Sequence, residues 1–289
     1  MRLQFLGTGA AEGIPPLFSR NDETERIRRE GGPDLRTRSS FRIGEEYQID
    51  FGPDAFFQSV RCNCDFYDLR HLIITHMHAD HIQLEAVVAK NMPYDTNGEP
   101  IILYGSVPGM EWLEKAVAVL TGKADAAALG EKYILKALEY YERYTVGELI
   151  LHTVRGNHRA MSETEYAINP LIELPDGRTL LYAVDTGYYE DASFEYLTGH
   201  KLDVLVMETT FGSRTDRGEY PAGHLDAHSF LRMLDRMERA GAVSTATKIY
   251  ATHINPKHEW NHAELQTFFD SSPYEVTVAS DCLEIPERR

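Results

Sequence analysis

Residues 75–81 read THMHADH and directly follow residues 71–74, HLII, which are predicted to form a strand. Three imidazoles and one carboxylate within this stretch suit a divalent metal, because neutral imidazole is a borderline-soft ligand and carboxylate is a hard one. Without a cation, ring nitrogens gathered this closely would compete for buried partners. Alternate residues that leave a strand point to one side. We therefore expect His76 and His78 to bind one ion, and Asp80 and His81 to reach a second.

Five strand-sized apolar runs organise the middle and end of the chain. They are rich in Ile, Leu, Val and Tyr, as buried strands are. A residue type that binds metal follows nearly every run, and strand ends that meet at one edge would bring these residues together. The runs are residues 69–75, 149–154, 179–184, 202–207 and 248–252, and the residues that follow them are His76, His158 after a short turn, Asp185, Glu208 and His253.

Helices are expected between the strands. Residues 83–89 follow the histidine-rich stretch, residues 110–119 and 131–144 are predicted to form a helical insert at about 107–149, and residues 227–240 carry apolar side chains at helical spacing. The charge-dense segment 19–42 is interpreted as a loop that covers part of the rim. Strands that alternate with helices predict an α/β or α+β fold. We expect residues 1–289 to form one domain.

Composition narrows the function classes. The 29 basic and 45 acidic residues give a formal net charge of -16, which opposes capture of extended nucleic acid. No apolar run reaches the ~20 residues needed to cross a bilayer, and residues 1–7 contain no signal-peptide core. A cytoplasmic location is therefore predicted. The odd number of cysteines, Cys62, Cys64 and Cys282, favours reduced thiols over a disulfide framework.

The HMHADH sequence resembles the HxHxDH signature of the metallo-β-lactamase superfamily, and three later residues match the order of that family's remaining ligands. The resemblance covers residues 3–281 and implies a four-layered αββα sandwich with a dinuclear site at the edge between two sheets. Redox relatives carry HxExD instead, so this pattern is typical of the hydrolases. The implied ligands are His76, His78 and His158 for the first ion, Asp80, His81 and His253 for the second, and Asp185 as the bridging carboxylate.

Three segments carry a narrower resemblance. Residues 6–15 (LGTGAAEGIP), residues 36–40 (RTRSS) and the pair Gly223-His224 are similar to the branch that holds the carbon-phosphorus lyase accessory phosphodiesterase PhnP and tRNase Z, with the PqqB proteins nearby. Members of that branch often carry a zinc-binding cysteine cluster after the opening segment. Residues 18–24 contain no cysteine here, so no structural zinc is expected. The glycines of the opening segment are assigned to a structural turn.

The resemblance implies two divalent ions, Zn or Mn, with Fe or Ni also compatible with the ligands. Such ions lower the pKa of bound water from ~15.7 toward ~7, so a metal-bound hydroxide is the expected nucleophile. The positive charge of the two ions would exceed the negative charge of Asp80, Asp185 and the hydroxide. The site would therefore favour an anionic substrate. His224 is the candidate proton donor for the leaving oxygen, by resemblance to the branch's phosphate-contacting histidine. Asp80 is a second candidate catalytic residue. His228, four residues after His224, is expected on the same helix face, where it could support or replace His224.

Other polar residues receive less specific expectations. Glu208 is expected to orient a ligand histidine or to remain a solvated acid at a strand end. Arg36 and Arg38 would contact a substrate phosphate or belong to a charged exposed loop. The histidines expected in ordinary core or surface positions are His71, His152, His200, His258 and His262.

The leading hypothesis is a dinuclear metal-dependent phosphodiesterase that acts on small or cyclic phosphodiesters. A tRNase Z-like ribonuclease ranks lower, because residues 107–149 hold five Lys or Arg against seven Asp or Glu and offer no basic arm. A lactone or ester hydrolase is a third possibility, since the metal ligands alone do not distinguish carbon from phosphorus. The fourth is a PqqB-like non-catalytic metal-binding protein. A homodimer is common among relatives.

Overall fold

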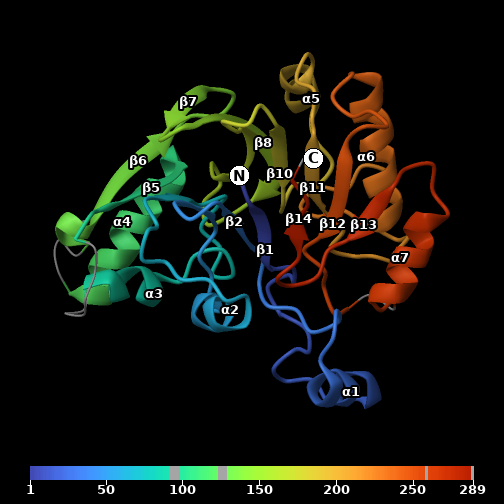
Figure 1. Ribbon diagram of the computed structural model, residues 1–289, viewed down its shortest axis with the longest axis horizontal. Helices are drawn as coiled ribbons and strands as arrows, with labels where there is room; N and C mark the ends of the chain where they lie inside the picture. Colours follow the sequence, from blue (N-terminus) through green and yellow to red (C-terminus); the bar gives the residue numbers. More distant parts are fainter. Residues whose placement is uncertain (92–97, 123–128, 258–259, 288–289) are drawn as a thin grey trace.

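The computed structural model describes residues 1–91, 98–122, 129–257 and 260–287, which contain two seven-stranded sheets (Figure 1). The first sheet has the order β14-β1-β2-β3-β4-β5-β6 and the second β13-β12-β11-β10-β9-β8-β7. The strands of the first sheet are β1 (Leu3–Gly7), β2 (Ser40–Ile43), β3 (Tyr47–Ile49), β4 (His71–Ile73), β5 (Ile101–Ser106), β6 (Tyr133–Leu138) and β14 (Glu284–Ile285). Those of the second are β7 (Arg143–Val146), β8 (Leu149–Arg159), β9 (Tyr166–Glu173), β10 (Thr179–Ala183), β11 (Val204–Glu208), β12 (Lys248–Thr252) and β13 (Val276–Val278).

Helices cover the outer face of each sheet. Figure 1 shows α3 (Leu84–Val88) and α4 (Val107–Thr121) on the outside of the first sheet, with α2 (Ala55–Arg61) at its lower end. The second sheet is covered by α5 (Asp191–Leu197), α6 (Ala227–Arg239) and α7 (His262–Asp270). Buried apolar side chains form one cluster between the sheets and one under each helical layer. This is the αββα sandwich that the sequence predicted.

The parallel strands of both sheets end at a common edge. Strands β3 to β6 run parallel in the first sheet, and β10 to β13 run parallel in the second. Three residues just past β3, β10 and β12 have left-handed backbone conformations, with φ of 60° at Asp50, 52° at Asp185 and 57° at His253. Such angles are uncommon outside glycine and often occur at functional sites. At this edge they turn the chain immediately after each strand.

The predicted helix at residues 131–144 is wrong. These residues form β6 and β7, which lie at the edges of the two different sheets. β6 pairs in parallel with β5 along its whole length, from Tyr133 opposite Ile101 to Leu138 opposite Ser106. Its Leu, Ala and Lys residues favour a helix in isolation, but pairing with the sheet outweighs that local preference. Among its described residues, the predicted helical insert therefore contains one α-helix, α4, and one turn of 3-10 helix, η3 (Gly130–Lys132).

The segment 19–42 is not an irregular loop. It contains α1 (Asp22–Glu30), a helix that protrudes below both sheets in Figure 1, and it leads into β2. Asn21 caps the helix in a capping box with Thr24. The charges that suggested a loop are spaced three and four residues apart and stabilise the helix as ion pairs, such as Arg26 with Glu23 and Glu30.

Two of the three cysteines are joined, which contradicts the expectation of reduced thiols. Cys62 and Cys282 form a disulfide across 220 residues of sequence, and Cys64 remains a free thiol. The pairing arises because β14 adds to β1 and so carries the C-terminal segment to the end of α2. Arg61 and Asp281 form an ion pair of 3.0 Å beside the disulfide. This proximity is tertiary and has no signature in cysteine number or spacing.

Removing this cross-link is expected to destabilise the protein. A Cys62→Ser, Cys282→Ser double variant should lose about 2–4 kcal/mol of unfolding free energy, because the unfolded chain regains the freedom that the disulfide removes. Denaturant unfolding measures the loss, and Cys64→Ser serves as the control with unchanged stability. Titration of the unreduced, unfolded wild type should find the Cys64 thiol alone. Reaction of all three cysteines would contradict the pairing.

No helix within the described ranges is both long enough and apolar enough to cross a membrane.

Candidate metal centre

The first group of candidate ligands comes from both sheets. His76 and His78 follow β4, and His158 lies near the end of β8, within the strand rather than after a turn. Nδ1 of His78 lies 3.0 Å from Nε2 of His76 and 3.2 Å from Nε2 of His158. These three ring nitrogens are close enough to share one ion. The structure therefore brings together the three residues that the sequence assigned to the first metal.

The second group lies on the other side of the same edge. Nε2 of His81 lies 3.2 Å from Oδ2 of Asp80, and Nε2 of His253 lies 3.8 Å from the same oxygen. Asp185 completes this group, whose ligand atoms all lie within 4.8 Å of one another. These are the residues that the sequence assigned to the second metal, together with the expected bridging carboxylate.

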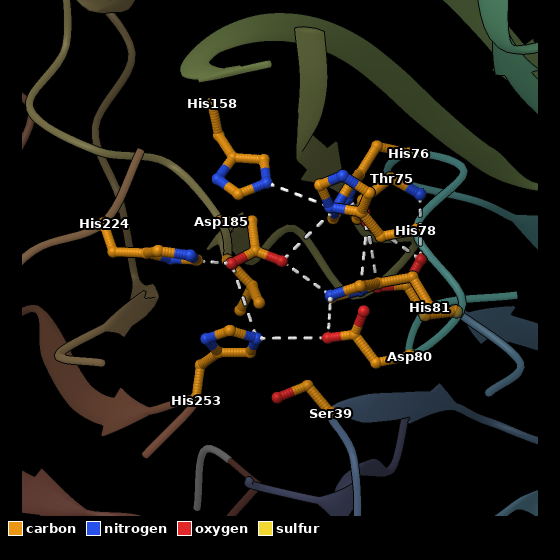
Figure 2. A network of polar contacts seen from close by, with 12 residues as sticks. Ser39, Thr75, His76, His78, Asp80, His81, His158, Asp185, His224 and His253 are labelled. Carbon is orange, nitrogen blue, oxygen red and sulfur yellow. Dashed lines mark hydrogen bonds and ion pairs between the residues drawn. The ribbon is translucent and has the colours of Figure 1, made fainter. Parts of the chain in front are cut away.

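Asp185 lies between the two groups, and Figure 2 shows its carboxylate at the centre of the histidines. One oxygen, Oδ2, lies 2.6 Å from Nε2 of His81 and 3.4 Å from Nε2 of His76. The other, Oδ1, lies 3.4 Å from Nε2 of His253 and 3.0 Å from Nδ1 of His224. A carboxylate that reaches ring nitrogens of both groups is placed as a bridging ligand requires.

Four of the candidate ligand histidines hold their second ring nitrogen in a hydrogen bond. Such outer partners fix the tautomer and the ring orientation of metal-binding histidines. All four partners contact Nδ1, and in each of these histidines Nε2 contacts another candidate ligand. The pairs are His81 Nδ1 with Asp50 Oδ2 at 2.7 Å, His253 Nδ1 with Thr210 Oγ1 at 2.9 Å, His158 Nδ1 with the Gly223 carbonyl at 2.9 Å, and His76 Nδ1 with Thr75 Oγ1 at 3.1 Å.

The protonation states of the first group and of the two carboxylates suit cation binding. Burial, reinforced by neighbouring imidazoles, lowers the pKa of His76, His78 and His158, so their rings are neutral at neutral pH, as ligation requires. Burial would raise the pKa of Asp80 and Asp185, but the surrounding histidines hold both well below the usual value. The first group therefore offers neutral nitrogens and the second offers two carboxylates. His81 differs, because burial would lower its pKa but the carboxylates of Asp80, Asp50 and Asp185 raise it well above the usual value, so an ion bound there would displace its proton.

The residues present fit a metal pair. Nε2 of His81, Nε2 of His253 and Oδ1 of Asp185 are buried and make no hydrogen bond of good geometry. Buried polar atoms without partners are costly, and these three converge on the centre of the site. Cations coordinated there would supply the missing partners. His76, His78 and His158 would hold one ion, Asp80, His81 and His253 the other, and Asp185 both, as the sequence predicted.

Glu208 and His224 extend the site beyond these ligands. Glu208 is fully buried at the end of β11 and accepts hydrogen bonds from the Thr186 amide at 2.7 Å and the Gly187 amide at 2.9 Å. Its other oxygen lies 3.0 Å from Nδ1 of His224. Burial would lower the pKa of His224, but the carboxylates of Glu208 and Asp185 raise it to about 10. Glu208 thus orients His224 and the turn that carries Asp185. It also reaches the candidate ligand His253 through Thr210, whose hydroxyl donates to Glu208 and lies 2.9 Å from Nδ1 of His253.

These features match a known family. The model of the β-lactamase superfamily domain matches residues 47–254, which include every candidate ligand. The chain belongs to the β-lactamase superfamily. A relative named ribonuclease Z, from Methanococcus aeolicus, is 20% identical over 335 aligned residues that cover 98% of this chain and 97% of the relative.

Two solved structures show the same superfamily architecture. A diphosphatase of the PhnP family has a TM-score of 0.71 at 20% identity and covers 99% of this chain and 97% of that one. Zinc-bound PqqB from Methylobacterium extorquens has a TM-score of 0.67 at 16% identity and covers 99% of this chain and 100% of that one. At these identities the likeness establishes the shared fold.

Both arginines proposed for substrate contact are held by other residues of the protein, and Arg36 is inaccessible. Arg36 is buried, donates to Thr8 Oγ1 at 2.8 Å and lies 2.9 Å from Nδ1 of His262. Arg38 pairs with Asp54 at 3.1 Å and donates to a backbone carbonyl. Both guanidinium groups join the loop after β1 to neighbouring segments. The charged-loop alternative was also wrong for Arg36, whose side chain is inside the protein.

His228 does not support His224. It is on α6, and its ring packs edge-on against Phe268 of α7 at 5.1 Å. Of the histidines expected in ordinary positions, His71 stacks on Tyr47 and His152 pairs with Glu173, while His200 packs on His152 and His262 contacts Arg36. His258 lies outside the described residues.

Two residues that orient candidate ligands, Asp50 and Thr210, were not predicted from the sequence. Asp50 lies directly after β3 and accepts from Thr75 and His81, and Thr210 lies two residues after the end of β11. The rule that found the ligands, a polar residue after a strand, would also have found Asp50. The strand before Asp50 is only three residues long and was not recognised in the sequence, so Asp50 was not recognised either.

Proposed function

We propose that this protein is a metal-dependent phosphodiesterase that hydrolyses small phosphodiesters. The observation that carries the proposal is the position of His224, whose Nδ1 lies 3.0 Å from Glu208 and 3.0 Å from the central Asp185. A proton donor held beside a candidate dinuclear centre supplies what the cleavage of a phosphate ester needs at its leaving oxygen. Divalent ions bound by the candidate ligands would polarise a phosphoryl oxygen and lower the pKa of water.

His224 and Glu208 work as a pair in this proposal. The Nδ1–H group of His224 donates to Glu208, which is fixed by two backbone amides. Nε2, for which the described residues offer no hydrogen-bond partner, then carries the proton that passes to the leaving oxygen as the P–O bond breaks. A cation on Asp185 would offset that residue's effect on the pKa of His224. Glu208 then remains as the group that keeps His224 protonated.

A ribonuclease is the second candidate, favoured by the full-length similarity to a protein named ribonuclease Z. The formal net charge of -16 opposes it, because binding of RNA depends on cationic surface and counterion release. An acidic protein with a small cationic centre is better suited to a small anion than to a polyanion.

A substrate panel on metal-reconstituted protein tests the proposal. Metal-free protein is loaded with Zn or Mn and assayed with bis(4-nitrophenyl) phosphate, cyclic nucleotides, structured RNA and a lactone. We expect hydrolysis of small phosphodiesters, loss of this activity with a chelator and recovery on adding metal. Cleavage of RNA alone would favour the ribonuclease. Hydrolysis of the lactone without any phosphodiester, or no hydrolysis at all, would contradict the proposal.

A further inference from the structure

A cationic and aromatic pair lies beside His224. The loop of residues 209–226, which joins β11 to α6, carries Phe211, Arg217 and His224 itself. The ring of Phe211 meets the ring of His224 edge-on, with centroids 5.7 Å apart and planes at 72°. The guanidinium carbon of Arg217 lies 4.0 Å from the centroid of Phe211, which places the cation over the ring. His224, Phe211 and Arg217 therefore form a continuous row that leads away from Asp185.

The loop that carries this row is tied to the rest of the protein. Arg232 of α6 donates to the carbonyl of Glu219 at 2.8 Å and to that of Gly218 at 3.3 Å. At the other end of the loop, the Gly223 carbonyl lies 2.9 Å from Nδ1 of His158 and the Gly223 amide donates to Asn157. The position of Arg217 relative to the candidate metal centre is thus set by contacts on both sides.

Arg217 forms no close ion pair with a carboxylate in the described part of the chain. The neighbouring Asp216 pairs with Arg214 and attracts Arg217 only at longer range. The Nε of Arg217 is buried without a hydrogen-bond partner, and Nη2 makes only a long contact of 3.4 Å with the Ala222 carbonyl. Arg214 lies farther from the same ring, at 5.7 Å, and is paired with Asp216. In a protein with 45 acidic residues, a half-buried arginine would be expected to form an ion pair with a carboxylate. Among the residues described, Arg217, which lies near the proton donor, does not, and its charge is therefore open to an anionic ligand.

We propose that Arg217, held flat on Phe211, binds a second anionic group of the substrate on the leaving-group side of the scissile bond. This inference rests on the proposed function, because the leaving oxygen faces His224 and the group attached to it extends toward Phe211 and Arg217. The planar guanidinium fork matches the oxygens of a phosphate or carboxylate.

The substrate class that fits is a phosphodiester with an anionic leaving group, above all a diester of diphosphate. Water adds across the P–O–P bridge in that reaction. One phosphorus gains the hydroxyl group, and the bridging oxygen leaves with the other phosphorus as a phosphate monoester. The proton held at Nε2 of His224 passes to this monoester, and Arg217 binds its remaining charge.

The test compares two substrates that differ in leaving-group charge. Diadenosine diphosphate releases an anionic phosphate monoester, whereas bis(4-nitrophenyl) phosphate releases a nitrophenol. We expect Arg217→Gln to raise KM for diadenosine diphosphate by about 10- to 100-fold and to change kcat/KM for the nitrophenyl diester by less than about twofold. Arg217→Lys should recover part of the loss. Arg214→Gln, which removes a cation from the same ring, is the matched control and should leave both substrates unaffected.

Equal losses on the two substrates would overturn the proposal, because Arg217 would then only hold the loop. The absence of any loss for diadenosine diphosphate would also overturn it. If the wild type hydrolyses neither diester, the proposed function fails. The anion site is then tested independently by the binding of methylene diphosphonate to metal-loaded protein. Calorimetry should then give at least tenfold weaker binding to Arg217→Gln than to Arg214→Gln, and equal binding would refute the site.

Discussion

Asp185→Asn is expected to remove metal from both halves of the centre and to lower kcat/KM by about 10³-fold or more. Among the described residues, Asp185 is the one side chain whose oxygens reach ring nitrogens of both histidine groups, at 3.4 Å to His76 and 2.6 Å to His81. An asparagine of the same shape keeps one oxygen but loses the charge that balances two divalent cations. Both the water-activating and the phosphoryl-polarising functions would then weaken together.

Metal analysis and steady-state kinetics on the same preparation measure this result. Asp191→Asn is the matched control, because Asp191 is an exposed carboxylate that pairs with Arg236 at the protein surface. It should keep the metal content and activity of the wild type. An Asp185→Asn protein that folds, binds the wild-type amount of metal and retains its activity would show that Asp185 is not a bridging ligand. Loss of one metal alone would assign Asp185 to a single ion.

The candidate ligands could be predicted from sequence because their order in the chain is set by the strands that carry them. His76, Asp185 and His253 each come shortly after a short strand that is mostly buried, and parallel strands end at one edge. The pattern therefore fixes both the residue type and its approximate place in space. His158 is the instructive exception, because it lies within β8 and still reaches the same edge.

The remaining features depend on contacts that local sequence does not encode. Residues 131–144 have helix-forming side chains, yet β6 forms because β5 offers an unpaired edge. Cys282 lies beside Cys62 because β14 pairs with β1. Charge density likewise suggested that Arg36 is exposed, but the polar groups of Thr8 and His262 surround it inside the protein. In each case a partner distant in sequence decides the outcome.

His224→Asn is expected to slow hydrolysis in proportion to how poor the leaving group is. A diester that releases an alkoxide needs a proton at the leaving oxygen and should lose about 10²- to 10⁴-fold in kcat/KM. A diester that releases 4-nitrophenol needs little protonation and should lose less than about tenfold. Glu208→Gln should follow the same pattern less severely, because glutamine still accepts a hydrogen bond from Nδ1 but no longer favours the charged imidazole.

His228→Asn is the control, since His228 lies four residues farther along and packs on Phe268 instead of the centre. It should behave as the wild type with both leaving groups. Metal content separates two roles for His224, because Asp185, Glu208, His224 and His253 also lie close enough together to hold an ion. A His224→Asn protein with full metal content and a steep leaving-group dependence supports proton donation. Loss of metal with equal slowing of both diesters would make His224 a ligand, and the proton would have to come from elsewhere.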